Sequence, residues 1–190
     1  MAKLAASAYG QALYELAIES GSAAGYLDEV QIVLEVFKEN GELTDFLNNP
    51  KISKTDKVKT MESIFDSRVR KDITGLIVLA VEKDRQNDIR GILEYFITAV
   101  KDYLKIGIVS VATPMELSDR QKAEVEKRIL DTTAFKKLEM NYSVEKSLIG
   151  GMVIRIKDRV VDSSIKTKLN NMAKSLSEIQ LSNETGKCKE

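Results

Sequence analysis

Apolar residues recur at helical spacing through the first hundred residues of the chain. The sixth of these apolar stripes, which starts at Ile89 and ends at Leu104, is the most regular. Repeats at i, i+3, i+4 and i+7 are typical of amphipathic helices, and short connections between such helices favour antiparallel packing in a compact bundle. The pattern therefore predicts a helical domain over residues 1–105, with six helices over residues 4–20, 27–40, 43–47, 53–65, 69–81 and 89–104.

Beyond residue 105 the apolar period changes from helical to alternating. Ile106 to Ala112 alternates as a strand does, and Lys137 to Val144 alternates even more strictly. Between them, Ser118 and Gln121 have the spacing of a capping box that opens a helix. A third strand over 150–156 and a fourth around Val160 complete the pattern. The chain is thus predicted to be α+β, with a small βαβββα domain over residues 106–180 and a polar, disordered tail over 181–190.

The stretch from Leu148 to Leu169 combines a strand, a turn, a second strand and the start of a helix. Lys157 and Asp158 have the spacing of a two-residue hairpin loop, although Lys is not favoured at its first position. A strained backbone or a longer loop is therefore implied, and the turn type stays open. The residues that follow offer caps for a helix, whose apolar positions recur at helical spacing. The caps are Asp162, Ser163 and Ser164, and the apolar positions are Ile165, Leu169, Met172, Ala173 and Leu176.

The paired glycines before the third strand, Gly150 and Gly151, admit two interpretations. They suggest a phosphate cradle, but such a loop needs more glycines and a Lys with Ser or Thr at a helix start. A bulge or a close approach of two backbone segments is the favoured interpretation.

Composition removes most catalytic and metal chemistry. Lys plus Arg equals Asp plus Glu at 29 each, so no net field attracts nucleic acid. No His occurs in the 190 residues, which removes the commonest general base and metal ligand, and the one cysteine, Cys188, lies in the polar tail. No apolar run is long enough to span a bilayer. We expect no cofactor, no metal site and a reduced cytoplasmic setting.

Three groups of residues still invite a functional interpretation. Asp158 and Asp162 are evenly spaced and would suit an acid and base pair, but hairpin ends carry Asp for turns and caps. Ser163 and Ser164 lack the partners of a nucleophile and are interpreted as caps. A locally basic region would suit an acidic partner helix or a phosphate, with a solvated face as the simpler alternative. Its members are Arg155, Lys157, Arg159, Lys166 and Lys168.

The first helix carries an apolar stripe wider than one bundle member needs. It is rich in small residues, which let another helix approach closely. Core packing is the simpler explanation, and a groove for a partner helix is the alternative. The stripe consists of Leu4, Ala5, Ala8, Tyr9, Ala12, Leu13, Leu16 and Ala17.

Two motifs give the chain a resemblance to a known family. Tyr9-Gly-Gln-Ala-Leu-Tyr-Glu-Leu-Ala17 resembles the first-helix pattern of the delta subunits of rotary ATP synthases, which are equivalent to the mitochondrial oligomycin-sensitivity conferral protein. Leu148 to Leu169 is similar to the signature of the same family, in which Gly150, Gly151, Asp158, Asp162 and Ser163 match. The sequence departs from that signature at Lys157, where the family usually has Gly. The resemblance covers residues 3–180.

The resemblance implies a non-catalytic stator subunit, present once per complex. In this family the helical domain holds the N-terminal helix of an alpha subunit on the catalytic head, and the C-terminal domain joins the b subunit of the peripheral stalk. The protein would then lie at the cytoplasmic face of the cell membrane, reaching the membrane only through the complex. The family's alpha-binding groove lies between the first and fifth helices, which corresponds here to Tyr9, Ala12, Leu13, Leu16, Leu76, Leu79 and Ala80.

Two other classes of function remain open on the sequence. One is a helical adaptor with a small α+β module unrelated to ATP synthase. The other is an enzyme that uses Asp158 and Asp162.

Overall fold

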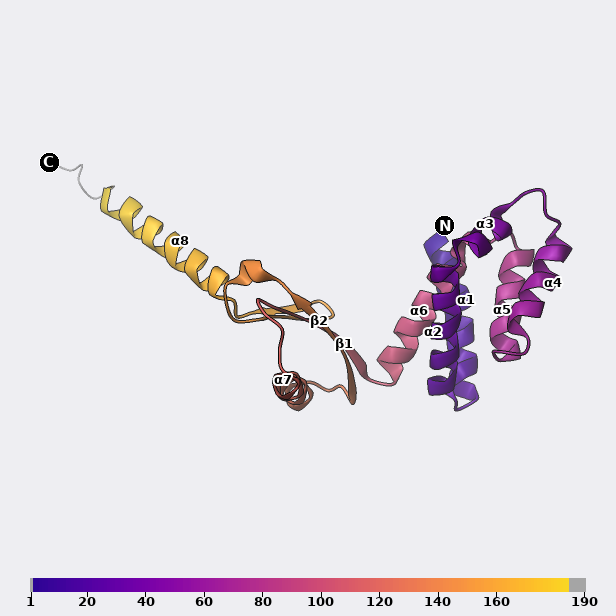
Figure 1. The fold of residues 1–190 in the computed structure, drawn as a ribbon, viewed down its shortest axis with the longest axis horizontal. Coiled ribbons are helices and arrows are strands. Elements are labelled where there is room, and N and C mark those ends of the chain that lie inside the picture. Colours follow the sequence, from indigo (N-terminus) through magenta and orange to yellow (C-terminus); the bar gives the residue numbers. More distant parts are fainter. Residues whose placement is uncertain (1, 185–190) are drawn as a thin grey trace. The chain divides into compact units, whose positions relative to one another are not determined.

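The computed structural model describes residues 2–184, with side chains described from Ser7 to Leu176. The chain forms two compact units that divide between Leu104 and Lys105. The first unit is entirely helical, and the second combines a sheet with two helices, as the sequence predicts (Figure 1).

The first unit contains six α-helices and one short 3₁₀ helix, η1. The predicted helix count is confirmed, with ends that differ by a few residues. The helices are α1 (Ala2–Glu19), α2 (Ala23–Glu39), α3 (Gly41–Asn48), α4 (Lys54–Phe65), α5 (Lys71–Glu82), η1 (Gln86–Asp88) and α6 (Ile89–Tyr103).

Helix α6 carries the core of the first unit, because α1 and α2 both pack on it. Most of its apolar face is buried, and this is the face whose regular spacing stands out in the sequence. Phe37 of α2 stacks on Phe65 of α4, with ring centroids 6.0 Å apart, and so joins α4 to the same core. The buried residues of α6 include Ile89, Ile92, Leu93, Phe96 and Val100.

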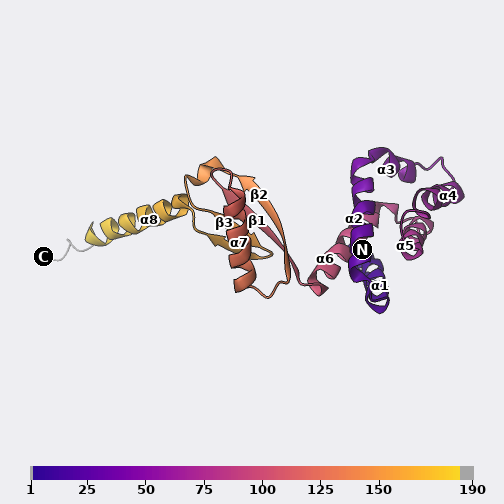
Figure 2. The same ribbon diagram turned by 60° about the horizontal axis from the view of Figure 1, so that its bottom comes forward.

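The second unit is built on a four-stranded sheet in the order β2-β1-β3-β4. β1 and β2 are parallel and are linked through α7, while β1–β3 and β3–β4 are antiparallel (Figure 2). The order along the chain is βαβββα, as predicted. The elements are β1 (Ile106–Thr113), α7 (Asp119–Thr132), β2 (Lys137–Val144), the 3₁₀ helix η2 (Lys146–Leu148), β3 (Val153–Ile156), β4 (Arg159–Asp162) and α8 (Ile165–Glu184).

One face of the sheet forms the core of the second unit with α7. Val109 and Val111 of β1 are fully buried, and the register places Met140 and Ile156 beside Val109 on the same face. Ile129 of α7 completes this cluster. The capping box predicted at the start of α7 is present, with the Ser118 hydroxyl accepting from the backbone N–H of Gln121.

In the second unit, two boundaries differ from the prediction. The third strand begins at Val153 instead of residue 150, because Gly150 and Gly151 belong to a loop that lies against the start of α8. At the other end, α8 runs to Glu184 and so includes residues 181–184, where the sequence predicts a disordered tail. Residues 185–190, which include Cys188, lie outside the described part of the chain.

Candidate interaction surfaces

Helix α1 divides its wide apolar stripe between the core and the surface. Leu13 and Ala17 are buried, and Gly10 lies against α6 so closely that a Cβ at this position would be 2.6 Å from Cδ1 of Tyr95. Ala12 and Leu16 are exposed, and 46% of Leu16 is accessible. Core packing therefore accounts for one row of the stripe only, and the other row remains as apolar surface.

Helix α5 contacts α1 and adds to this surface. Leu79 is 40% exposed and Leu76 is half-buried, while Ala80 is fully buried. The seven residues expected at the groove are thus carried by two helices in contact, in two layers. Ala12, Leu16 and Leu79 are exposed, Tyr9 and Leu76 are partly exposed, and Leu13 and Ala80 are buried beneath them. We call the exposed and partly exposed five the α1/α5 surface.

A polar cluster fixes the start of α5 on α2. The Tyr26 hydroxyl donates to the carboxylate of Asp72, while Glu29 accepts from the backbone N–H of Arg70 at 2.8 Å and from its Nε at 3.1 Å. The Arg70 guanidinium also lies 4.4 Å from the centroid of the Tyr26 ring. The hydrogen bond to Asp72, with a smaller effect of burial, raises the pKa of Tyr26, so the phenol remains a donor. This cluster holds the α5 face of the surface in place.

At the other end of the α1/α5 surface, Tyr9 has a cationic neighbour. The guanidinium of Arg85, just after α5, lies 5.5 Å from the centroid of the Tyr9 ring. Cation–π contacts of this kind are attractive and orient the ring. Tyr9, which begins the first motif, is therefore held towards α5.

Four of the five family-signature residues, Gly150, Gly151, Asp162 and Ser163, lie at the start of α8, and the fifth, Asp158, lies in the hairpin loop. A Cβ on Gly150 would lie 2.5 Å from Cδ1 of Ile165, and one on Gly151 would lie 2.4 Å from the carbonyl oxygen of Ser163. Gly151 also has a φ of +78°, a backbone angle that residues other than glycine rarely adopt. The glycine pair permits a close approach of two backbone segments, which is the favoured interpretation of the sequence.

Asp162 and Ser164 act as caps, as predicted, whereas the prediction is wrong for Ser163, whose hydroxyl is a donor and does not accept from α8. The Asp162 carboxylate accepts from the backbone N–H of Ser164 at 2.8 Å and from the hydroxyl of Thr167 at 2.7 Å. Ser164 accepts from the backbone N–H of Thr167, and the Ser163 hydroxyl donates to the carbonyl of Met152. The backbone hydrogen bond from Ser164, followed by side-chain hydrogen bonds, lowers the pKa of Asp162.

Asp158 and Asp162 do not form an acid and base pair. Asp158 lies in the hairpin loop, whereas Asp162 ends β4, opposite Val153 at the far end of the hairpin. Four residues of strand separate their Cα atoms by roughly 13 Å. Both oxygens of Asp162 are also occupied by the cap of α8.

The hairpin loop has two residues, and Lys157 carries the strain that its identity implies. Its φ is +49°, in the left-handed region that glycine favours. Its ammonium lies 5.7 Å from the centroid of the Phe135 ring. The departure from the family pattern is thus accommodated by a strained residue without lengthening the loop.

The basic residues near the hairpin do not form one patch. Arg155 and Arg159 point to opposite faces of the sheet, because Arg159 pairs with Ile156 and Arg155 with Val160. Lys166 and Lys168 lie on α8 and are exposed.

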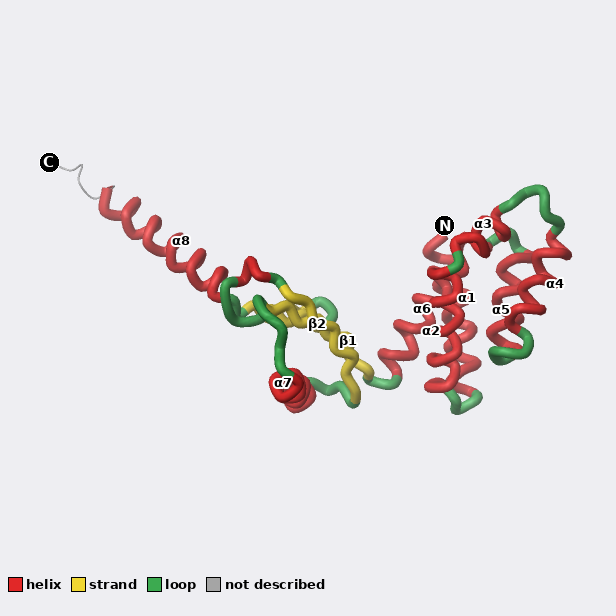
Figure 3. Tube along the Cα trace, in the orientation of Figure 1, coloured by secondary structure: helices red, strands yellow, loops and turns green. Residues whose placement is uncertain are grey.

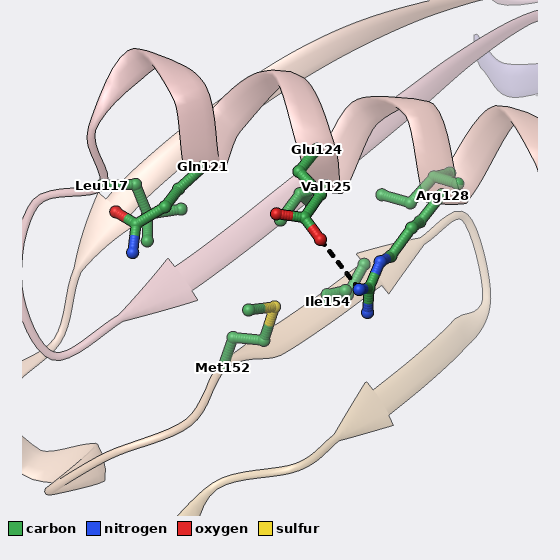
Figure 4. Close-up of a pocket in the computed structure, with 8 residues that line it drawn as sticks. Leu117, Gln121, Glu124, Val125, Arg128, Met152 and Ile154 are labelled. Carbon is green, nitrogen blue, oxygen red and sulfur yellow. Dashed lines mark hydrogen bonds and ion pairs between the residues drawn. The ribbon is translucent and has the colours of Figure 1, made fainter.

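A pocket beside α7 has no counterpart in the sequence predictions. It has a volume of about 330 Å³ and is mostly apolar, and its lining includes the ion pair of Arg128 and Glu124 (2.8 Å; Figure 4). It exists because a single helix covers part of a four-stranded sheet, a property of the packing that periodicity does not reveal. Its lining residues are Leu117, Gln121, Glu124, Val125, Arg128, Ile129, Met152 and Ile154.

Within residues 2–184, no helix has both the length and the hydropathy needed to cross a membrane. Among the same residues, no three Cys, Asp or Glu side chains gather as ligands for a metal ion would.

Comparison with known proteins gives a consistent result. Residues 5–176 match the family model described as ATP synthase delta (OSCP) subunit. ATP synthase subunit delta of Lachnoclostridium phytofermentans is 45% identical over 181 residues, which cover 95% of this chain and 100% of that protein. The subunit of the same name from Desulforamulus reducens is 33% identical over 161 residues, which cover 85% of this chain and 88% of that protein.

A solved structure shares the fold. A chain in the cryo-EM structure of the Toxoplasma gondii mitochondrial ATP synthase hexamer matches 90% of this chain and 96% of its own length, with a TM-score of 0.69 and 16% identity. The family model covers both units and both motifs identified in the sequence. The chain therefore belongs to the ATP synthase delta (OSCP) subunit family.

Proposed function

We propose that the chain is the stator subunit that links the catalytic head of a rotary ATP synthase to its peripheral stalk. The first unit holds the N-terminal helix of an alpha subunit on the α1/α5 surface, and the second unit joins the C-terminal region of the b subunit. One copy serves each complex, at the cytoplasmic face of the membrane and attached to it only through the complex.

The observation that carries the proposal is the exposed apolar row of α1 beside that of α5. Leu16 and Leu79 are large aliphatic side chains that a monomer gains nothing by exposing. Burying a fully exposed leucine contributes about 1.5–3 kcal/mol, so covering the exposed part of each of these two contributes about half as much. A helix laid on two packed helices is a common recognition mode, and its apolar anchors would meet these residues.

The role is mechanical and requires no bond-making step. Torque from the rotor acts on the head, and the stator opposes it if its interfaces in series remain bound under load. The residues that were considered as catalytic candidates have structural contacts instead. Asp162 and Ser163 hold the start of α8 in place, and Asp158 lies in the hairpin loop.

A binding experiment with two matched variants tests the first interface. The probe is a peptide of the N-terminal helix of the alpha subunit from the same organism, titrated calorimetrically into the full chain. Leu16→Asp is expected to weaken binding at least tenfold, because it places a charge in the interface. Ile32→Asp on α2, an equally drastic change at a residue that is 58% exposed outside the α1/α5 surface, is expected to leave the affinity within twofold.

Leu13 and Ala80 are unsuitable for this test because they are buried, and a charge there would unfold the bundle. Thermal unfolding of the Leu16→Asp and Ile32→Asp variants is expected to match the wild type. A wild-type chain that fails to bind the peptide would contradict the proposed role of the first unit. Equal affinity of the Leu16→Asp variant and the wild type for the peptide would contradict the assignment of the α1/α5 surface as the binding site.

A further inference from the structure

Helix α8 exposes an unbroken apolar stripe. Ile165, Leu169, Met172 and Leu176 are between 43% and 65% accessible, and every residue from Lys168 to Leu176 is exposed. Their spacing of four, three and four residues is that of the d and a positions of a heptad repeat. Such a stripe on a solvent-exposed helix is typical of one strand of a coiled coil that lacks its partner.

The base of α8 is fastened to the second unit, whereas the rest of the helix extends away from the sheet (Figures 1 and 3). The Ile165 N–H donates to the Gly150 carbonyl at 3.0 Å, and the cap of Asp162 and Thr167 closes the first turn. The helix is therefore presented by a rigid base, and its apolar stripe stays free for a partner.

The charges of α8 define what the partner must carry. In the heptad register set by Leu169 at a, Lys166 occupies e and Lys168 occupies g, the positions that flank the apolar seam. Residues 165–176 contain these two lysines and Lys174 but no acidic residue. A second copy of α8 would bring lysines against lysines across the seam. A helix with acidic residues beside its own apolar a and d positions would bring opposite charges together.

We infer that α8 pairs as a coiled-coil strand with an acidic amphipathic helix of another protein. The inference rests on the proposed function, which supplies the b subunit of the stalk as the source of that helix. It goes beyond that function in assigning the contact to the outward stripe of α8, and in requiring acidic side chains on the partner. The heptad pairing places Leu169 and Met172 in the seam and Asn170 outside it.

The experiment measures binding of the cytoplasmic region of the b subunit from the same organism to the full chain. Leu169→Asp and Met172→Asp are expected to weaken binding at least tenfold. Asn170→Asp adds the same charge at the b position of the same helix and is expected to change the affinity less than twofold. Changing Lys166 and Lys168 together to Glu is expected to weaken binding at least fivefold at low salt, with the difference reduced in high salt.

The outcomes separate the inference from the function on which it rests. If the wild type does not bind the b region, the proposed function of the second unit fails. If the wild type binds and Leu169→Asp binds equally well, the stalk contact lies elsewhere and the inference on α8 is wrong. If the double Glu variant binds more tightly than the wild type, the partner is not acidic and the inference is likewise wrong.

Sedimentation velocity of the free chain tests the alternative of a second copy. A monomer is expected, because the seam lysines repel each other. A dimer that Leu169→Asp dissociates would overturn the inference in favour of self-association through α8.

Discussion

The two units differ in how much of their apolar surface is buried. The first unit buries a complete core around α6 and leaves a narrow apolar row on α1 and α5, whereas the second unit has a small core and displays the whole apolar stripe of α8. The narrow apolar row on the first unit is suited to binding a helix of a partner. The exposed stripe of α8 is suited to packing as a helix against a partner. This difference supports the proposal that one chain joins two partners by two different modes of helix recognition.

The contrast is sharpest when the same substitution is made in both units. Leu93→Ala on α6 removes a fully buried side chain and is expected to cost about 2–5 kcal/mol of unfolding free energy. Leu169→Ala on α8, at a residue that is 52% exposed, is expected to change it by less than about 0.5 kcal/mol. Urea denaturation followed by circular dichroism measures both. Equal losses would show that α8 is packed in the free chain.

The glycine at the base of α8 tests how rigidly that helix is presented. Gly151→Ala is expected to cost about 1–3 kcal/mol, because the new Cβ meets the backbone carbonyl of Ser163, which cannot rotate away. Gly21→Ala is the matched control, since Gly21 has a similar φ of +64° with no atom near its Cβ position. It should show only the smaller backbone cost, in the same denaturation experiment. Equal effects at the two glycines would mean that the base of α8 is loose.

The contact between α1 and α6 allows a similar comparison inside the first unit. Gly10→Ala is expected to destabilise by about 1–2 kcal/mol, because its Cβ meets the ring of Tyr95, although this half-exposed ring can shift. Gly75→Ala on α5 meets nothing and is expected to stabilise by about 0.5–1 kcal/mol through helix propensity. Thermal unfolding measures whether each substitution raises or lowers the stability. A stabilising Gly10→Ala would contradict the close packing of α1 on α6.

The smallest expected effect is a pH dependence of the α8 cap. Hydrogen bonds lower the folded-state pKa of Asp162 below its ordinary value of 3.8. The stabilising contribution of the cap is therefore fully present above pH 3.8 and is lost as the pH falls through the lowered pKa. An NMR titration of the Ser164 amide shift is expected to report a pKa below 3.8.

In the matched variant Asp162→Asn, the Ser164 amide should show no such titration. An apparent pKa of 3.8 or above in the wild type would contradict the cap.

Periodicity predicted the elements of this fold because it records which faces are apolar. The stripe of α6 and the alternation of β1 and β2 identified both units, and the capping box of Ser118 fixed the start of α7. The predicted start of β3 was wrong by three residues. Gly150 and Gly151 fit the alternating pattern of a strand, but they form a loop because of their contacts with Ile165 and Ser163. Those contacts join residues whose proximity no local pattern encodes.

For the α1/α5 surface, the family resemblance implied the seven residues, which stay a prediction, but it did not tell which of them are exposed. Leu13 and Leu16 belong to one apolar stripe, yet only the structure separates the buried residue from the accessible one. The stripe of α8 was visible as helical spacing, but spacing cannot tell a covered face from an uncovered one. The pocket beside α7 depends on how much of the sheet one helix covers, which is likewise a tertiary property.

The most direct test of the two recognition modes measures both partners against the same pair of variants. The full chain carrying Leu16→Asp or Leu169→Asp is titrated separately with the alpha-subunit helix peptide and with the cytoplasmic region of the b subunit. Leu16→Asp is expected to weaken the affinity for the peptide at least tenfold and to leave the affinity for the b region unchanged. Leu169→Asp is expected to weaken the affinity for the b region and to leave that for the peptide unchanged. A variant that loses both partners, or neither, would contradict the assignment of one partner to each surface.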